Sequence, residues 1–249
     1  MKVYLYLLAA IFSFSCNAVA EQEVITAGYK GTVGKQLVGM TLIVDDKQII
    51  TNSHYYYFKH ITDIPLTGIA GTSIKAQEPG GGTFELHFIG NGSNGNVPLS
   101  FENSIGLSGT WTGPGGKVLP VMLSGGGTSG PADPPGTRWY QSVTSNKSDQ
   151  EFEAQVKGFY DAVMTDNRMA ATKFVTFPLR VNFTPEKHTY IHNSREFIAL
   201  WDHIFSPTWL KMAKNEAPHD MGISNNLAAL GQGLAYFGED GVEVINAEP

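Results

Sequence analysis

The sequence predicts an α+β protein in which a β-rich N-terminal part precedes a part that mixes helices and strands. Three observations lead to this fold class. Between Tyr29 and about Leu123, short runs of β-favouring residues alternate with glycine-rich turns. The segment 124–147 is rich in glycine and proline, as interdomain linkers are. After Ser148, apolar residues recur at helical spacing.

The first 20 of the 249 residues predict a secretory signal peptide that is cleaved after Ala20. The run 3–14 is almost entirely apolar, but it is shorter than the roughly 20 residues that a helix needs to cross a bilayer. The small residues Ala18 and Ala20 match the positions that a signal peptidase reads. We therefore expect a periplasmic or secreted protein.

The alternative is a lipoprotein signal with its lipid anchor at Cys16. Ser13 and Phe14 stand where such a signal normally has Leu and a small residue, so the match is poor. Cleavage after Ala20 would remove the one cysteine of the chain, which excludes thiol chemistry. No later apolar run approaches transmembrane length, so we expect no membrane span after cleavage.

The charge balance and the absence of known motifs exclude several function classes. The chain has 17 Lys and Arg against 23 Asp and Glu, a formal net charge of -6. This acidity argues against a nucleic-acid partner and would suit a basic protein partner. The sequence also lacks a nucleophile elbow, a phosphate-binding loop and a dinucleotide fingerprint.

The region 21–123 is expected to form an antiparallel β meander, either a small barrel or a sandwich. Glycine clusters at 80–82, 90–92 and 113–116 mark its turns. No window in this region has helical periodicity. The expected strands are 37–44, 48–52 together with 55–57, 64–68, 72–76, 83–88, 105–111 and 117–123.

The region 148–249 begins with a capping box, Ser148 with Glu151, that predicts a helix. Its apolar face is Phe152, Val156, Phe159 and Val163. The elements expected after it are a short helix at 169–171, a strand at 174–183 that is an edge or bulged at Pro178, a helix capped by Ser194, a short helix at 206–212, and a hairpin within 226–245.

Four segments of this region carry a resemblance to the NTF2-like (cystatin-like) superfamily. They are 159–162, 177–179, the helix around 197–205, and 231–237 in the final hairpin. More narrowly, they resemble uncharacterised exported bacterial proteins of that class. The resemblance implies a cone of helices on a curved antiparallel sheet, with a conical pocket and a possible homodimer through the sheet. It does not imply one reaction, because members include dehydratases, isomerases, transport adaptors and binding domains.

If the protein is an enzyme, the resemblance implies a carboxylate or a histidine in the apolar cone. Asp161, Asp202 and His203 are the candidates for this acid/base role. The alternative interpretation is that Asp161 ends a helix and that Asp202 and His203 face solvent. Spacing alone favours this second interpretation.

We expect no metal and no cofactor. No pair of the seven histidines has the spacing of a helical zinc site. His188 and His192 could share one face of a strand, but no third ligand is apparent.

Aromatic residues are the candidate binding residues. In Tyr55-Tyr56-Tyr57-Phe58, alternation along a strand directs two rings to each face. Exposed rings here, with Trp111, could form a recognition patch; alternatively, the far face packs against the second domain. Tyr160 and Tyr236, in the segments that carry the resemblance, complete the set, whereas Trp201 and Trp209 are expected in the core.

The sequence therefore favours a non-catalytic exported binding module, such as an inhibitor or immunity-type protein. Its ligand would be a protein partner or a small hydrophobic molecule. The alternative is an enzyme that performs acid/base chemistry on a small hydrophobic substrate in the cone. A cone filled by Phe and Trp side chains would favour the binding module.

Overall fold

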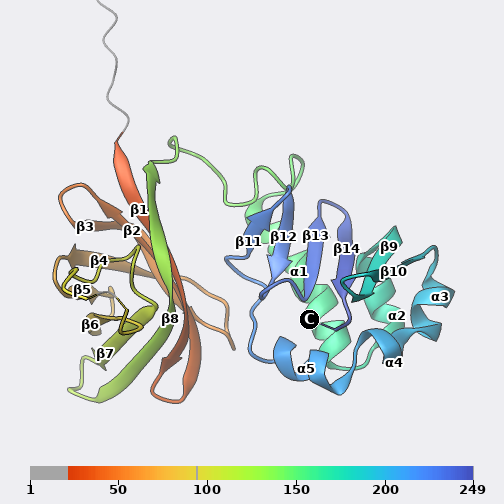
Figure 1. Ribbon diagram of the computed structural model, residues 1–249, viewed down its shortest axis with the longest axis horizontal. Helices are drawn as coiled ribbons and strands as arrows, with labels where there is room; N and C mark the ends of the chain where they lie inside the picture. The colour runs from red at the N-terminus through yellow and green to blue at the C-terminus, as the bar shows by residue number, and fades with distance from the viewer. Residues whose placement is uncertain (1–21, 94, 249) are drawn as a thin grey trace, which may run out of the picture.

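The computed structural model describes residues 22–93 and 95–248, which form two lobes side by side (Figure 1). The expected signal peptide at 1–20, with Cys16, lies outside the described residues. Among the described residues, no helix is long and apolar enough to cross a membrane. The N-terminal lobe consists of strands, and the C-terminal lobe packs helices against a sheet, so the α+β class is confirmed.

The N-terminal lobe is a closed antiparallel barrel, which decides between the two expected β architectures. Each strand pairs with its neighbours along the chain, and β1 closes the barrel against β8. The eight strands are β1 (Glu23–Val33), β2 (Gln36–Asp45), β3 (Ile49–Tyr57), β4 (Ile64–Ala70), β5 (Ile74–Gln77), β6 (Thr83–Ile89), β7 (Gly106–Thr112) and β8 (Val118–Pro131).

Alternation along the strands fills the barrel. In β6, Phe84 and Leu86 point inward and are at most 2% exposed, whereas the residues between and beside them face outward. Their inward neighbours across the sheet, Ala76 and Ile74 of β5, are buried as well. The apolar residues at every second position, which predicted the strands, are therefore the residues that pack in this core.

The predicted linker at 124–147 is wrong in its first part, because residues up to Pro131 belong to β8 and pair with β1. Backbone hydrogen bonding does not need large side chains, so a glycine-rich run serves as well as an apolar one. At Gly125, with φ of 148°, a Cβ atom would lie 2.1 Å from the carbonyl oxygen of Gly28, so close strand approach requires glycine.

The second part of that segment is also more ordered than a flexible linker. Tyr140 is fully buried in the C-terminal core, and Val143 packs there too. Trp139 donates its indole N–H to the carbonyl oxygen of Met221 at 2.9 Å. The connection therefore docks on the C-terminal domain before the first helix begins.

The C-terminal domain starts at the predicted capping box. Ser148 accepts a hydrogen bond from the Glu151 backbone, and the Glu151 carboxylate accepts one in return. The helices are α1 (Asp149–Met164), α2 (Arg168–Ala171), the 3-10 turn η1 (Thr172–Phe174), α3 (Ser194–Ala199), α4 (Trp201–Ile204) and α5 (Pro207–Ala213). Asn193 caps α3, one residue before the predicted Ser194, because its side chain accepts from the backbone of Glu196.

Six strands form the second sheet in the order β10-β9-β14-β13-β12-β11. They are β9 (Val175–Thr184), β10 (Lys187–Ile191), β11 (Gly222–Ser224), β12 (Leu227–Leu230), β13 (Ala235–Gly238) and β14 (Gly241–Asn246). The expectation of an antiparallel sheet is wrong for one pair, since β14 runs parallel to β9. The register between them shifts around Pro178, which therefore lies at a bulge rather than at an edge.

Candidate functional site

The acidic candidates of the C-terminal domain lie on its surface. Asp161 pairs with Lys157 one turn earlier in α1, and its side chain is 54% exposed. Asp202 pairs with Arg168 at 2.7 Å, and its side chain is 77% exposed. His203 follows it on the exposed side of α4. None of the three has the desolvated surroundings that acid/base chemistry in a cone would need.

Aromatic rings fill the interior that the resemblance would make a pocket. Trp209 is 1% exposed and Trp201 is 3% exposed, as expected for core residues. The cavities that we describe among residues 22–93 and 95–248 lie at the domain junction or on the barrel, not in this core. The rings packed there are Phe152, Phe159, Phe197, Trp201, Phe205, Trp209 and Phe237.

The tyrosine run in β3 divides between the two faces of the barrel wall. Tyr55 is buried inside the barrel, with its ring centroid 5.1 Å from that of Phe84, and its hydroxyl donates to Glu78. Tyr56 points outward and contacts His219 of the C-terminal domain edge-on, with centroids 4.4 Å apart. The alternative in which the far face meets the second domain is therefore confirmed for Tyr56.

The other predicted binding residues do not gather into one patch. Tyr57 and Trp111 are partly buried and pack against the barrel core. Tyr160 packs against the C-terminal core and donates its hydroxyl to the carbonyl oxygen of Ala213 at 3.0 Å. Tyr236 is partly buried in β13. Tyr57 and Trp111 thus belong to the barrel, whereas Tyr160 belongs to the C-terminal domain and also lines a cavity at the domain junction.

Titratable side chains from both domains meet at the junction, around His219. His54 comes from β3 and Asp63 from the turn before β4. Glu153 comes from the first turns of α1, whereas His219 and Asp220 stand in the loop before β11. We call these five residues the junction cluster.

The junction cluster is tightly connected. His219 Nδ1 lies 2.6 Å from Glu153 Oε2, and His219 Nε2 lies 2.8 Å from Asp63 Oδ1. His54 Nε2 lies 2.6 Å from Asp220 Oδ2. A salt-bridge network of this kind links the barrel to the C-terminal domain through side chains that are mostly buried.

Neutral groups hold the carboxylates of the junction cluster in place. The hydroxyl of Thr41 donates to Asp220 Oδ2 at 2.8 Å, and the hydroxyl of Tyr140 donates to Glu153 Oε1 at 2.8 Å. Tyr140 accepts in turn from the backbone N–H of Met221 at 2.9 Å. Thus even the segment that connects the domains contributes to the junction.

The electrostatics of the cluster favour positive charge on its imidazoles. Burial opposes the charged form of His219, but hydrogen bonds to Asp63 and Glu153 outweigh it and raise its pKa to about 10. Burial opposes the charged form of His54 too, yet the bond to Asp220 and its charge raise the pKa of His54. Burial would raise the pKa of Asp63, whereas its bond to His219 lowers it.

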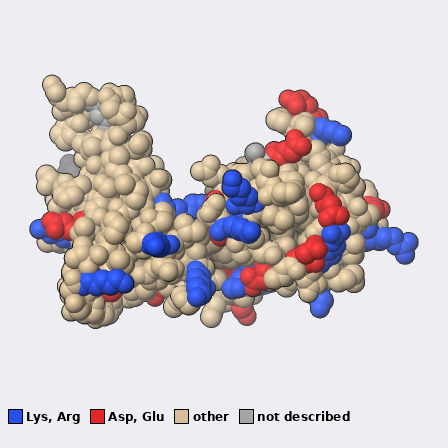
Figure 2. Space-filling model, turned by 90° about the horizontal axis from the view of Figure 1, so that it is seen from below, with Lys and Arg blue, Asp and Glu red and all other residues tan. Residues whose placement is uncertain are grey.

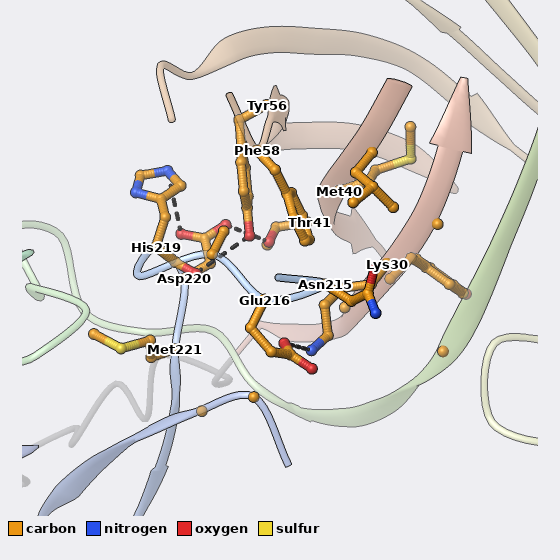
Figure 3. Close-up of a pocket in the computed structure, with 18 of the residues that line it drawn as sticks. Lys30, Met40, Thr41, Tyr56, Phe58, Asn215, Glu216, His219, Asp220 and Met221 are labelled. Atoms are coloured by element: carbon orange, nitrogen blue, oxygen red, sulfur yellow. Dashed lines mark hydrogen bonds and ion pairs between the residues drawn. The ribbon is translucent and has the colours of Figure 1, made fainter. Parts of the chain in front are cut away.

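A groove of about 540 Å³ opens beside the cluster, between the outer wall of the barrel and the loop 215–222 (Figure 3). Thr41 and Tyr56 extend from the barrel toward Asp220 and the loop that holds it. Farther along, Lys30 of β1 pairs with Glu216 across the groove.

This site could not be predicted from the sequence. His54, Asp63, Glu153 and the pair at 219–220 come from four segments, and no local spacing connects them. Closure of the barrel and docking of the C-terminal domain bring them together.

Comparisons with models of known protein families, with curated proteins and with solved structures find no match for this chain. The functional conclusion therefore rests on the geometry of the junction.

Proposed function

We propose that this chain is an exported, non-catalytic binding protein that takes an acidic segment of a protein partner into the groove between its two domains. An inhibitor or immunity-type protein would act in this way. The observation that carries the proposal is that lysines from both domains line the groove of a chain whose net charge is -6.

The groove of about 540 Å³ adjoins a second cavity of about 410 Å³, and we refer to both together as the groove. The two cavities share Leu37, Phe58 and Glu216 in their walls. Both lie between the barrel and the C-terminal domain. An extended peptide segment fits such a continuous groove better than a compact ligand does, since it can contact both cavities at once.

The basic side chains are placed for an acidic ligand. Lys30, Lys35 and Lys59 come from the barrel, and Lys157 and Lys214 come from the C-terminal domain. Figure 2 shows basic side chains gathered along the notch between the lobes. Such a cluster attracts opposite charge and steers its approach.

Three of these lysines are free to bind. Lys35, Lys59 and Lys214 are exposed, and within residues 22–93 and 95–248 none of them makes an ion pair. Between them, Phe58 and Ile61 supply apolar surface. Alternating positive and apolar contacts suit a polypeptide that carries both carboxylates and apolar side chains. The net charge of the whole chain would suit a basic partner, but the three unpaired lysines of the groove favour an acidic one.

The C-terminal core supports binding rather than catalysis. The candidate acid/base residues lie outside it, and rings occupy the space that a substrate would need. An NTF2-like fold for this domain remains part of the proposal, since an alternation of helices with a sheet is common to several superfamilies.

Retention of the purified protein on immobilised poly-L-glutamate at low ionic strength tests the proposal. We expect the wild type to be retained and to elute with salt, because screening weakens contacts between exposed charges. A variant with Lys35→Glu, Lys59→Glu and Lys214→Glu should pass through the column.

The matched control reverses three exposed lysines away from the groove, as Lys47→Glu, Lys117→Glu and Lys173→Glu. It has the same net charge as the groove variant, and we expect it to be retained nearly as well as the wild type. Equal weakening in both variants, or no retention of the wild type, would contradict the proposed function.

A further inference from the structure

We propose that the junction cluster is a binding site for a divalent transition metal ion, with Zn²⁺ as the ion that best fits its ligands. His54, Asp63 and His219 would bind the ion, and Asp220 would be the fourth ligand. The site is separate from the lysines of the groove and does not depend on the partner proposed for them. It departs from the expectation of no metal, which considered His188 and His192.

Ligand atoms of three side chains converge in the junction cluster. One ligand atom each of His54, Asp63 and His219 lie within 4.8 Å of one another. His54 Nε2 is 3.5 Å from Asp63 Oδ1, and His219 Nε2 is 2.8 Å from the same oxygen. Zinc bonds to nitrogen and oxygen of about 2.0–2.2 Å place tetrahedral ligands about 3.3 Å apart. The observed separations therefore fit around one ion after small side-chain shifts.

Asp220 completes a four-ligand set. Its two carboxylate oxygens lie 2.6 Å from His54 Nε2 and 3.9 Å from His219 Nε2. Four protein ligands with two from each domain would make a closed site, which is typical of structural rather than catalytic zinc. The ion would then clamp the barrel to the C-terminal domain.

Outer partners hold the proposed ligands in place. Glu153 contacts Nδ1 of His219, which leaves Nε2 directed at the other ligands. A carboxylate on the far nitrogen of a histidine is the usual support of a zinc ligand. Tyr140 fixes Glu153, and Thr41 fixes Asp220. Ligands and supports thus form two layers, as they do in metal sites.

Ligand chemistry and access decide which ion fits. Two imidazole nitrogens and two carboxylate oxygens favour Zn²⁺ over Ca²⁺ and Mg²⁺, which prefer oxygen ligands. Each imidazole would release its extra proton to solvent as the ion binds, so binding should weaken at low pH. The two carboxylate ligands, Asp63 and Asp220, would also balance the charge of a divalent ion. The Asp63 side chain is 50% exposed, whereas that of His219 is 10% exposed, so an ion would enter past Asp63.

Isothermal titration of the chelator-treated protein with Zn²⁺ tests the site. We expect one Zn²⁺ per chain and no binding of Mg²⁺ or Ca²⁺ under the same conditions. Asp63→Asn should weaken Zn²⁺ binding at least about tenfold, and its exposed position should leave the fold intact. His54→Ala should abolish the stoichiometric binding.

Two further variants separate the proposal from a general loss of structure. Glu153→Gln should weaken Zn²⁺ binding by about 10–100-fold, because it removes only the outer support. The matched control combines Asp202→Asn with His203→Ala, the same residue types on the exposed surface of α4, and should bind Zn²⁺ as the wild type does. Near-UV circular dichroism would confirm that each variant is folded.

A wild type that binds no stoichiometric Zn²⁺ would overturn the proposal, and the junction cluster would then be a salt-bridge network alone. Binding that survives both Asp63→Asn and His54→Ala, or that the control loses equally, would overturn it as well. The groove is tested independently: Asp63→Asn should keep its retention on poly-L-glutamate, and the triple lysine variant should keep Zn²⁺ binding.

Discussion

A methyl group added at Gly39 should separate the two domains locally, whereas the same change at Gly28 should not. Gly39 faces Tyr56 across the strand pair β2–β3, and a Cβ atom built on it would lie 2.3 Å from the Tyr56 ring. His219 contacts the ring edge-on, and the Tyr56 hydroxyl donates to the His219 carbonyl oxygen at 3.2 Å. Gly39→Ala therefore pushes the ring away from the C-terminal domain.

The expected loss of stability in Gly39→Ala has two contributions. Overpacking a fitted site costs about 1–3 kcal/mol. Loss of the edge contact between Tyr56 and His219 adds about 0.5–1.5 kcal/mol. We therefore expect Gly39→Ala to lower the free energy of unfolding by about 1.5–4.5 kcal/mol. At Gly28 nothing lies within 4 Å of the added atom, so Gly28→Ala should change it by less than about 0.5 kcal/mol.

Urea denaturation followed by tryptophan fluorescence measures both variants. The decisive comparison is a double-mutant cycle with Tyr56→Ala, which removes the ring that the methyl group meets. In that background, Gly39→Ala should cost under about 0.5 kcal/mol, because the ring that the added methyl group would meet is absent. Equal effects of Gly39→Ala and Gly28→Ala, or full additivity with Tyr56→Ala, would show that the Tyr56 ring does not block a methyl group at Gly39.

Three further substitutions test the packing by the same urea assay. Ser148→Ala removes the cap of α1 and should cost about 1 kcal/mol, so an unchanged midpoint would speak against the capping box. Phe237→Ala opens a cavity in the fully buried C-terminal core and should cost about 3–5 kcal/mol; a loss below about 1 kcal/mol would mean that the ring is not packed as described. Asp202→Ala removes the exposed ion pair with Arg168, so we expect no measurable shift in midpoint, and a large shift would contradict the surface position of Asp202.

Much of the fold could be predicted from periodicity. Strands with inward residues such as Phe84 and Leu86, and the helix begun by Ser148, follow from patterns local to the chain. The strand at 124–131 could not be predicted this way, since glycine-rich residues pair through backbone groups and depend on β1 as a partner. The parallel pairing of β14 with β9 also depends on how the chain returns after three helices.

The candidate site was predicted less well, for a physical reason. The resemblance made Asp161 and Asp202 candidates for acid/base chemistry, but both form exposed ion pairs. The alternation of Tyr55 and Tyr56 did predict that the rings divide between two faces, and contact of one face with the second domain was one of the two interpretations left open. His54 and His219 could not be paired from sequence, because 164 positions separate them and only the docking of the domains brings their rings to 6.3 Å.

An acidic ligand is expected to bind across both domains at the junction. Titration of the ¹⁵N-labelled protein with poly-L-glutamate, followed by amide chemical shifts, would locate the bound ligand. We expect the shifted amides to cluster around Lys35 and Lys59 of the barrel and around Lys214 of the C-terminal domain. Shifts confined to one domain, or absent from these three positions, would contradict this expectation.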